Sequence, residues 1–162
     1  MDMAVQAALR DSDLLYERAF GEHWRPVFRF LLAWTNDWNA AEDLAQEAFL
    51  RLWQNRDRID WREPVLPWLL VTGRRLATDR FRALRRRVLA PPGPSSLDEA
   101  MRVRWLDAQA ALKSLSKLER TAVALTLFEG ATTAEVADLL NTTPGAIRAA
   151  ISRAREKVEA AR

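Results

Sequence analysis

The chain has 162 residues, 49% of them apolar, and a net charge of +3, which leaves room for one medium or two small folded domains and excludes disorder throughout. With no cysteine and a single histidine, His23, it offers neither a disulfide framework nor a thiolate or histidine-rich metal site, so we expect no metal and no cofactor. No apolar run approaches the roughly 20 residues of a membrane span, and the start lacks the order of a secretion signal, so we expect a cytoplasmic protein without membrane insertion.

Two short helices are predicted at the start of the chain. Ser12 can cap the first, which Gly21 is expected to end. The second is expected from about residue 24 to a turn over residues 35–39, with Pro26 in its first turn, where a missing N–H is tolerated. The apolar positions predicted to face the core are Leu14, Leu15, Ala19, Val27, Phe28, Leu31 and Leu32.

The next predicted helix, AAEDLAQEAFLRLWQ with Asn39 as its N-cap, has two different faces. One is an apolar stripe that we expect to face the core: Ala41, Leu44, Ala45, Ala48, Phe49 and Leu52. The opposite face places a leucine among acidic and amide groups: Asp43, Gln46, Glu47 and Leu50. This face is predicted to bind a partner, with a solvated face carrying one exposed leucine as the alternative.

A charged loop over residues 55–63 follows, with Trp61 between Asp60 and Arg62. Trp53 and Trp68, on either side of it, are predicted to belong to the core. The loop leads into a helix expected from about residue 64 to residue 87 or 89. The second half of this helix has one acidic residue, Asp79, against seven arginines: Arg74, Arg75, Arg80, Arg82, Arg85, Arg86 and Arg87. Single-stranded DNA binding needs cations for the backbone and rings for unstacked bases, so the loop and helix are predicted to contact it.

Residues 90–96, APPGPSS, form the clearest domain boundary, because three prolines and a glycine suit a spacer and not a helix. Beyond it, a capping box of Ser96 with Glu99 predicts a helix to about residue 113. A second box, Ser116 with Glu119, predicts a helix that ends at Gly130. Its core-facing positions are expected to be Leu118, Ala122, Leu125 and Phe128.

The stretch TTAEVADLLNTTPGAIRAAISRAREKVEAAR is predicted to form a helix-turn-helix. Thr132 and Glu135 make a capping box for a short helix, which Asn141 can end in a left-handed conformation. Thr143 is the next N-cap and Pro144 the first helical residue, so the connection is too short for a loop. The second helix is expected to face inward with Ile147, Ile151, Ala154 and Val158.

The outward face of that second helix is small, polar and basic. Arg148, Ser152 and Arg153 can bond guanine edges or phosphates, so insertion into a major groove is predicted. The alternative is a plain helical hairpin whose arginines are solvated. The predicted fold is all-α, with two small helical domains, residues 1–89 and 97–162, joined by a flexible linker over residues 90–96.

Two of these stretches resemble the extracytoplasmic-function (ECF) group of bacterial RNA polymerase sigma factors. AEDLAQEAFLRLW resembles the region that docks on the polymerase clamp, and LSKLERTAVALTLFEGATTAEVADLLNTTPGAIRAAISRAR follows the fourth conserved region. The match covers about residues 12–89 and 97–160. The resemblance implies a promoter-recognition subunit that binds core RNA polymerase and promoter DNA, promotes strand opening, and is held inactive by an anti-sigma factor.

The resemblance also implies roles for single residues. The polymerase clamp would be bound by Asp43, Gln46, Glu47 and Leu50. The opened minus-ten element, with bases flipped from the stack, would be held by Trp61, Arg62, Arg74, Arg75, Asp79 and Arg80. The minus-thirty-five element would be read as duplex by Thr143, Arg148, Ser152 and Arg153.

Three positions depart from the family pattern. Arg75 stands where the family usually has Asn in the helix that melts the minus-ten element, so a different base preference is expected there. Ala150 stands where another basic residue is common, and Ala149 replaces a usual small polar residue. One duplex contact is therefore expected to be missing, worth about 1–3 kcal/mol if it paired with a base.

Two other classes of protein fit parts of the sequence. A conventional helix-turn-helix regulator would act without core polymerase, but it leaves the acidic and leucine-bearing face of residues 40–54 unexplained. An enzyme, such as a nuclease with a metal on Asp43 and Glu47, would need a third ligand, a histidine or a glycine-rich phosphate loop beside them, and the sequence offers none of these there. We therefore expect no enzymatic activity.

Overall fold

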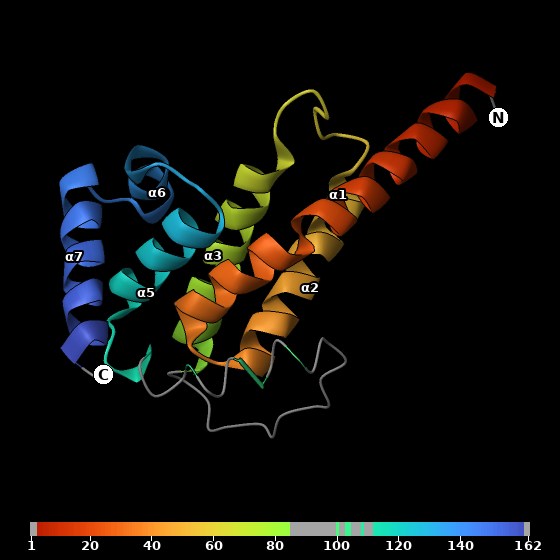
Figure 1. Cartoon of the computed structure of the whole chain (residues 1–162). Helices are drawn as coiled ribbons and strands as arrows, with labels where there is room; N and C mark the ends of the chain where they lie inside the picture. Colours follow the sequence, from red (N-terminus) through yellow and green to blue (C-terminus); the bar gives the residue numbers. More distant parts are fainter. Residues whose placement is uncertain (1–2, 85–99, 101–102, 105–107, 109–111, 161–162) are drawn as a thin grey trace.

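The protein consists of helices packed in two adjacent bundles (Figure 1). The structure, a computed structural model, describes residues 3–84, 100, 103–104, 108 and 112–160. The N-terminal bundle is α1 (Met3–Thr35), α2 (Trp38–Asn55) and α3 (Val65–Leu84). The C-terminal bundle is α5 (Lys117–Val123), which continues into the π-helical turn η1 (Ala124–Phe128), with α6 (Thr133–Leu140) and α7 (Pro144–Ala160). These described residues contain no strand, which confirms the predicted all-α class.

α1 is one continuous helix of 33 residues, so the predicted break at Gly21 is wrong. A glycine inside a helix costs only about 1 kcal/mol and a proline about 3 kcal/mol. Against this, the turns after Pro26 completely bury Val27, Phe28, Phe30 and Leu31, each worth about 1.5–3 kcal/mol. Leu14, predicted to face the core, is 63% exposed, although Ser12 two positions earlier is buried, so Leu14 lies on the outer side of α1.

Two predicted helix caps of the N-terminal bundle are also wrong. Ser12 lies inside α1, where its hydroxyl donates to Asp57 Oδ1 at 2.9 Å. The N-cap of α2 is Asp37 and not Asn39: its side chain accepts from the Ala40 N–H at 2.8 Å. Asn36, left-handed with φ 55°, reverses the chain between the two helices and leaves Asp37 in position to cap.

The predicted core stripe of α2 is confirmed. All of its members are at most 4% exposed: Ala41, Leu44, Ala45, Ala48, Phe49 and Leu52. α3 closes the bundle through Gly73, where a methyl group would lie 3.3 Å from Leu31 Cδ2 of α1, so glycine permits this close approach. The spacer at 90–96, the arginines at 85–87 and most of the helix expected before residue 113 lie outside the described residues.

The caps predicted within the described part of the C-terminal bundle are confirmed, whereas the box of Ser96 with Glu99 lies outside the described residues. Ser116 with Glu119, and Thr132 with Glu135, form complete capping boxes at the starts of α5 and α6. Asn141 ends α6 in the left-handed conformation, with φ 53°. These local signals therefore position α6 and α7 as expected.

Two predicted core residues of this bundle are exposed, Phe128 at 63% and Val158, near the end of α7, at 36%. The helix predicted to end at Gly130 does not stay α-helical: after Val123 it widens into η1. Widening to i→i+5 bonding shifts the helical phase, so Leu127 and Phe128 lie outward while Leu125 stays buried.

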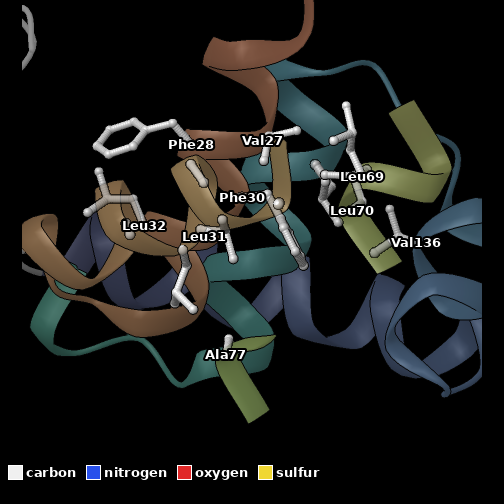
Figure 2. Close-up of a cluster of buried hydrophobic side chains, with 14 of the residues drawn as sticks. Val27, Phe28, Phe30, Leu31, Leu32, Leu69, Leu70, Ala77 and Val136 are labelled. Carbon is white, nitrogen blue, oxygen red and sulfur yellow. The ribbon is translucent and has the colours of Figure 1, made fainter. Parts of the chain in front are cut away.

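One hydrophobic core runs through both bundles, which was not predicted. It joins α1 and α3 with Ala122, Leu125 and Val136 of the C-terminal bundle, each at most 1% exposed. Figure 2 shows Leu70 of α3 close to Val136 of α6. The two bundles are therefore docked on each other through apolar side chains.

Polar contacts lie across the same interface. Arg120 of α5 donates from Nε to the Ala33 carbonyl of α1 at 3.0 Å, and from Nη1 to the Leu115 carbonyl. Arg29 Nε of α1 lies 3.2 Å from Glu129 Oε1. Burial raises the pKa of the Glu129 carboxyl, and the neighbouring Arg29 opposes that rise.

Candidate nucleic-acid and partner interfaces

The predicted partner face of α2 points away from the core. Asp43, Gln46 and Leu50 are exposed, Leu50 at 47%, and Glu47 is half-buried. Glu47 forms an ion pair of 3.2 Å with Arg51, one turn further on. The four predicted residues thus form one surface, which we name the α2 ridge, and its exposed leucine lies among charged and amide groups.

An aromatic groove of about 360 Å³ lies between α2 and α1, beside this ridge. Besides Gln46 and Leu50 of the ridge, it is lined by Tyr16, Phe20, Trp24, Phe49 and Trp53. Phe20 is 41% exposed and Trp53 37%, although Trp53 was predicted to belong to the core. Arg56 supports Trp53, with Cζ 3.9 Å from the ring centroid. Helical periodicity along one element missed this groove, because two helices build it together.

The loop between α2 and α3 holds its tryptophan firmly. Trp61 is half-buried against the core, and its Nε1 donates to the Arg56 carbonyl at 2.8 Å. Arg62 is exposed and makes two contacts with Asp60, at 2.9 and 3.0 Å. Their hydrogen bond lowers the pKa of Asp60 and raises the pKa of Arg62, because each charge stabilises the other. The loop therefore presents Arg62 to solvent while Trp61 stays anchored.

The predicted minus-ten residues of α3 divide between two sides of the helix. Arg75, Asp79 and Arg80 are exposed. Arg74 is half-buried, and its Nε is buried without a hydrogen-bond partner. Leu70 and Val71 of α3 line a cleft of about 510 Å³ together with residues of α6. Arg74 lies one helical turn after them, on the same side of α3. Arg74 is therefore partly withdrawn from solvent, unlike the three exposed residues of α3.

The helix-turn-helix is confirmed, and α7 presents its predicted DNA face outward. Arg148, Ser152 and Arg153 are exposed, and Ile147 and Ala154 are buried against the rest of the bundle. Thr143, also exposed, uses its hydroxyl as the N-cap, accepting from the Ala146 N–H at 3.2 Å. The Ser152 hydroxyl donates to Glu156 Oε1 at 3.4 Å.

The expectation of a missing duplex contact at Ala150 is wrong. Ala150 is completely buried, on the inner side of α7 with Ile147 and Ala154. A side chain at this position packs in the helix-turn-helix core and does not face DNA, so alanine there removes no groove contact. Ala149 is exposed, as expected for the outward face.

Glu119 ties α7 to α5. Only 3% exposed, it accepts from Lys157 Nζ at 2.8 Å and from Arg153 Nε at 3.3 Å, besides its capping bond to the Ser116 N–H. The hydrogen bond from Lys157, aided by the Ser116 amide and Arg153, lowers its pKa from 4.5 to about 2. Arg153 is therefore held in place while its side chain stays 52% exposed.

The carboxylates considered for an enzyme are each paired with an arginine, Asp43 with Arg80 and Glu47 with Arg51. Among the described residues, no group of three or more carboxylates and histidines could hold a metal ion. Across the same stretch of chain, no helix combines the length and the apolar character needed to cross a membrane.

Two family models match the chain in consecutive stretches. Sigma-70 region 2 matches residues 19–87, and Sigma-70, region 4 matches residues 105–158. The first match contains the α2 ridge and α3, and the second contains the helix-turn-helix.

Curated proteins are similar over most of the chain. The probable RNA polymerase sigma factor RfaY of Xanthomonas campestris is 38% identical over 147 residues, which cover 82% of this chain and 36% of that protein. The ECF RNA polymerase sigma factor SigL of Mycobacterium tuberculosis is 30% identical over 154 residues, covering 89% of this chain and 86% of SigL. CarQ of Myxococcus xanthus, an RNA polymerase sigma factor, is 31% identical over 153 residues and covers similar shares of both chains, 88% and 86%.

Solved structures share the fold. The sigma factor RpoE of Bartonella quintana, in complex with the anti-sigma factor NepR, superposes with a TM-score of 0.68 at 21% identity, covering 89% of this chain and 94% of RpoE. CnrH, in complex with the cytosolic domain of CnrY, gives a TM-score of 0.66 at 22% identity, covering 97% of this chain and 92% of CnrH.

Proposed function

Because the chain belongs to the extracytoplasmic-function group of RNA polymerase sigma factors, we propose that it binds core RNA polymerase, directs it to promoter DNA and promotes strand opening for transcription initiation. The observation that carries this proposal is the presence of three outward surfaces on one chain: the α2 ridge, the arginines of α3 and the outer face of α7. A plain DNA-binding protein needs only the last of them.

The α2 ridge is the proposed polymerase contact. Its carboxylates offer ion pairs to basic side chains, and Leu50 offers an apolar anchor at the centre of the charged groups. Interfaces commonly combine such an anchor with polar contacts around it. The aromatic groove beside Gln46 and Leu50 extends this surface onto α1 through Phe20 and Trp24.

The loop around Trp61 and the exposed side of α3 form the proposed minus-ten contact. Arg62, Arg75 and Arg80 supply cations for the phosphate backbone of a displaced strand. The anchored ring of Trp61 offers its accessible part to an unstacked base. Asp79 and the half-buried Arg74 are the remaining proposed minus-ten residues.

The outer face of α7 is the proposed minus-thirty-five contact. Arg148 and Ser152 lie in its N-terminal half, the part of a recognition helix that reaches base edges in a major groove. Arg153, held by Glu119, is positioned for a nearby phosphate or base, and Thr143 lies at the N-terminus of the helix.

An anti-sigma factor is the proposed regulatory partner, because RpoE, which shares this fold, was solved in complex with one. The proposed site of action is the cytoplasm, where core polymerase works. We assign the protein no catalytic residue, since initiation needs it only to bind and orient polymerase and DNA.

Transcription from genomic fragments tests the proposal. Core polymerase together with this protein is expected to start transcripts at defined sites, while either component alone starts none. The variant Asp43→Lys/Glu47→Lys is expected to abolish these transcripts and to keep duplex binding through α7. A protein that binds duplex sites but never changes where core polymerase starts is instead a conventional helix-turn-helix regulator.

A further inference from the structure

Glu119 of α5 uses its two carboxylate oxygens for different purposes. Oε2 accepts from the Ser116 N–H and from Lys157 Nζ, both at 2.8 Å, so it completes the cap of α5 and ties this helix to α7. Oε1 accepts from Arg153 Nε at 3.3 Å, and it has no other donor among the described residues. The packing of α5 on α7 (Figure 1) therefore has its cap and its shorter ion pair on Oε2, and the bond from Arg153 is additional to them.

Arg153 differs in this respect from the other arginines of α7. Arg148 and Arg155 are exposed, and within the described part of the chain neither side chain forms a hydrogen bond or an ion pair. The Arg153 side chain is 52% exposed, yet its Nε is bonded to a carboxylate side chain that is only 4% exposed. A carboxylate buried to this degree is held in place by the packed side chains around it. A free arginine side chain populates many rotamers, and the bond to Glu119 selects among them.

The guanidinium of Arg153 keeps the donors that guanine recognition needs. Arginine has five N–H groups in a planar fork, one on Nε and four on the two terminal nitrogens. With Nε bonded to Glu119, the terminal N–H groups remain for the O6 and N7 acceptors of a guanine in the major groove. This bidentate pairing depends on the plane and direction of the fork. A phosphate contact carries no sequence information, and a mobile arginine can make it.

We propose that Glu119 is a positioning residue for promoter recognition, which holds Arg153 so that its guanidinium reads one base pair of the minus-thirty-five element. The proposal rests on the proposed function, because it takes the DNA face of α7 from it. Lys157 keeps the buried carboxylate paired while Arg153 shares its charge with DNA. Without the carboxylate, Arg153 is free to bond the nearest phosphates of any sequence.

The competing explanation is that Glu119 only stabilises the junction of α5 and α7. Removal of the carboxylate lowers the stability of the fold under both explanations, so stability cannot separate them. Base preference separates them, because weaker folding or a changed net charge alters binding to all duplexes by one common factor. The preference at a single base pair is a ratio of two affinities, in which that common factor cancels.

The test uses the full chain and two variants that lack the carboxylate. Glu119→Gln/Lys157→Met removes the carboxylate together with its closest cation, so the net charge of the chain does not change. Glu119→Gln alone is the second variant, and in both of them glutamine still offers an oxygen to the Ser116 N–H. Lys157→Met alone is the matched control, because it loses the ion pair on Oε2 and keeps the bond from Arg153 to Oε1. Thermal unfolding verifies that each protein is folded at the temperature of the binding assay.

Each protein, assembled with core RNA polymerase, selects from a pool of random-sequence duplexes, and sequencing gives the preference at every base pair. Wild type and Lys157→Met are expected to select the same sequence. Removal of the carboxylate is expected to lower the preference at one G·C base pair by about tenfold and to leave the other positions within about twofold. Arg153→Ala should abolish the preference at that same base pair, and the addition of Glu119→Gln to it should have no further effect.

An unchanged base preference in the variants without the carboxylate would overturn the proposal. An equal loss of preference in Lys157→Met would also overturn it, since that variant keeps the bond between Glu119 and Arg153. A further loss on adding Glu119→Gln to Arg153→Ala would show that Glu119 does not act through Arg153. A wild-type protein that selects no sequence with core polymerase would overturn the proposed function, and this proposal with it.

Discussion

Arg80 of α3 lies with both terminal nitrogens 3.2 Å from Asp43 Oδ2 of α2. The two residues were predicted for different partners, Asp43 for polymerase and Arg80 for the minus-ten element. Both side chains are partly exposed, at 60% and 41%. The ion pair therefore links the two proposed surfaces, since a polymerase cation that takes Asp43 would release Arg80 toward DNA.

Removal of the charge at Asp43 is expected to strengthen single-strand binding by the free protein. An exposed ion pair is worth about 0.2–1 kcal/mol, so Asp43→Asn should raise affinity for a minus-ten non-template oligonucleotide by up to about fivefold. Fluorescence anisotropy measures this. Glu47→Gln is the matched control. It removes the same charge from the same ridge, but the native Glu47 pairs with Arg51 and not with Arg80. An equal gain with both variants would show a general charge effect and no specific release of Arg80.

Glu119 is expected to make the free energy of unfolding depend on pH in the acidic range. Its pKa is lowered in the folded protein, to about 2 from 4.5, so its stabilising contribution is present above about pH 4.5 and is lost as the pH falls toward 2. Glu119→Gln should lower the free energy of unfolding by about 1–3 kcal/mol at pH 7 and flatten this acid dependence. Urea unfolding at several pH values measures both. Glu159→Gln, which changes an exposed carboxylate of α7, should change neither.

Asn141 is expected to contribute to thermal stability through its backbone conformation. It ends α6 with φ 53°, a conformation that costs a residue with a β-carbon about 1–2 kcal/mol and that Asn and Gly tolerate best. Asn141→Ala should therefore lower thermal stability, and Asn141→Gly should preserve it or raise it slightly. Equal melting temperatures for the two variants would contradict this explanation of the turn.

Arg148 is expected to read the minus-thirty-five element. Arg148→Ala should weaken binding of a cognate duplex by about 1–3 kcal/mol and relax preference at one base pair. Arg155→Ala removes the same charge two turns further along α7. It should weaken binding to all duplexes by the same factor and reduce the salt dependence of binding, with no change in base preference. Competition binding against single-base variants distinguishes the two patterns.

The local signals of the sequence predicted the C-terminal helices well. Capping residues such as Thr132 and Asn141 act within one turn of the chain, so their outcome hardly depends on the rest of the fold. The core stripe of α2 was predicted equally well, because its apolar residues recur with the period of an α-helix. The exposed α2 ridge followed from the same period.

The features that were missed depend on contacts between distant residues. Arg120 bonds the Ala33 carbonyl, 87 positions earlier in the chain, and no local pattern announces that contact. Gly21 stays helical because burial of Val27 and its neighbours in α1 outweighs a local cost of about 1 kcal/mol. Phe128 turned outward because η1 changed the helical phase after Val123. Tertiary packing decided each of these outcomes.

The account depends most on the α2 ridge as the surface that binds polymerase. The most direct measurement is the affinity of labelled protein for core RNA polymerase, compared between wild type and Asp43→Lys/Glu47→Lys. A matched reversal at two exposed sites of the C-terminal bundle, Asp138→Lys/Glu159→Lys, makes the same change in net charge away from the ridge and its groove. We predict tight binding by wild type and by the control pair, and a loss of at least about a hundredfold for the ridge variant. Equal affinity of the ridge variant and the control would contradict the account.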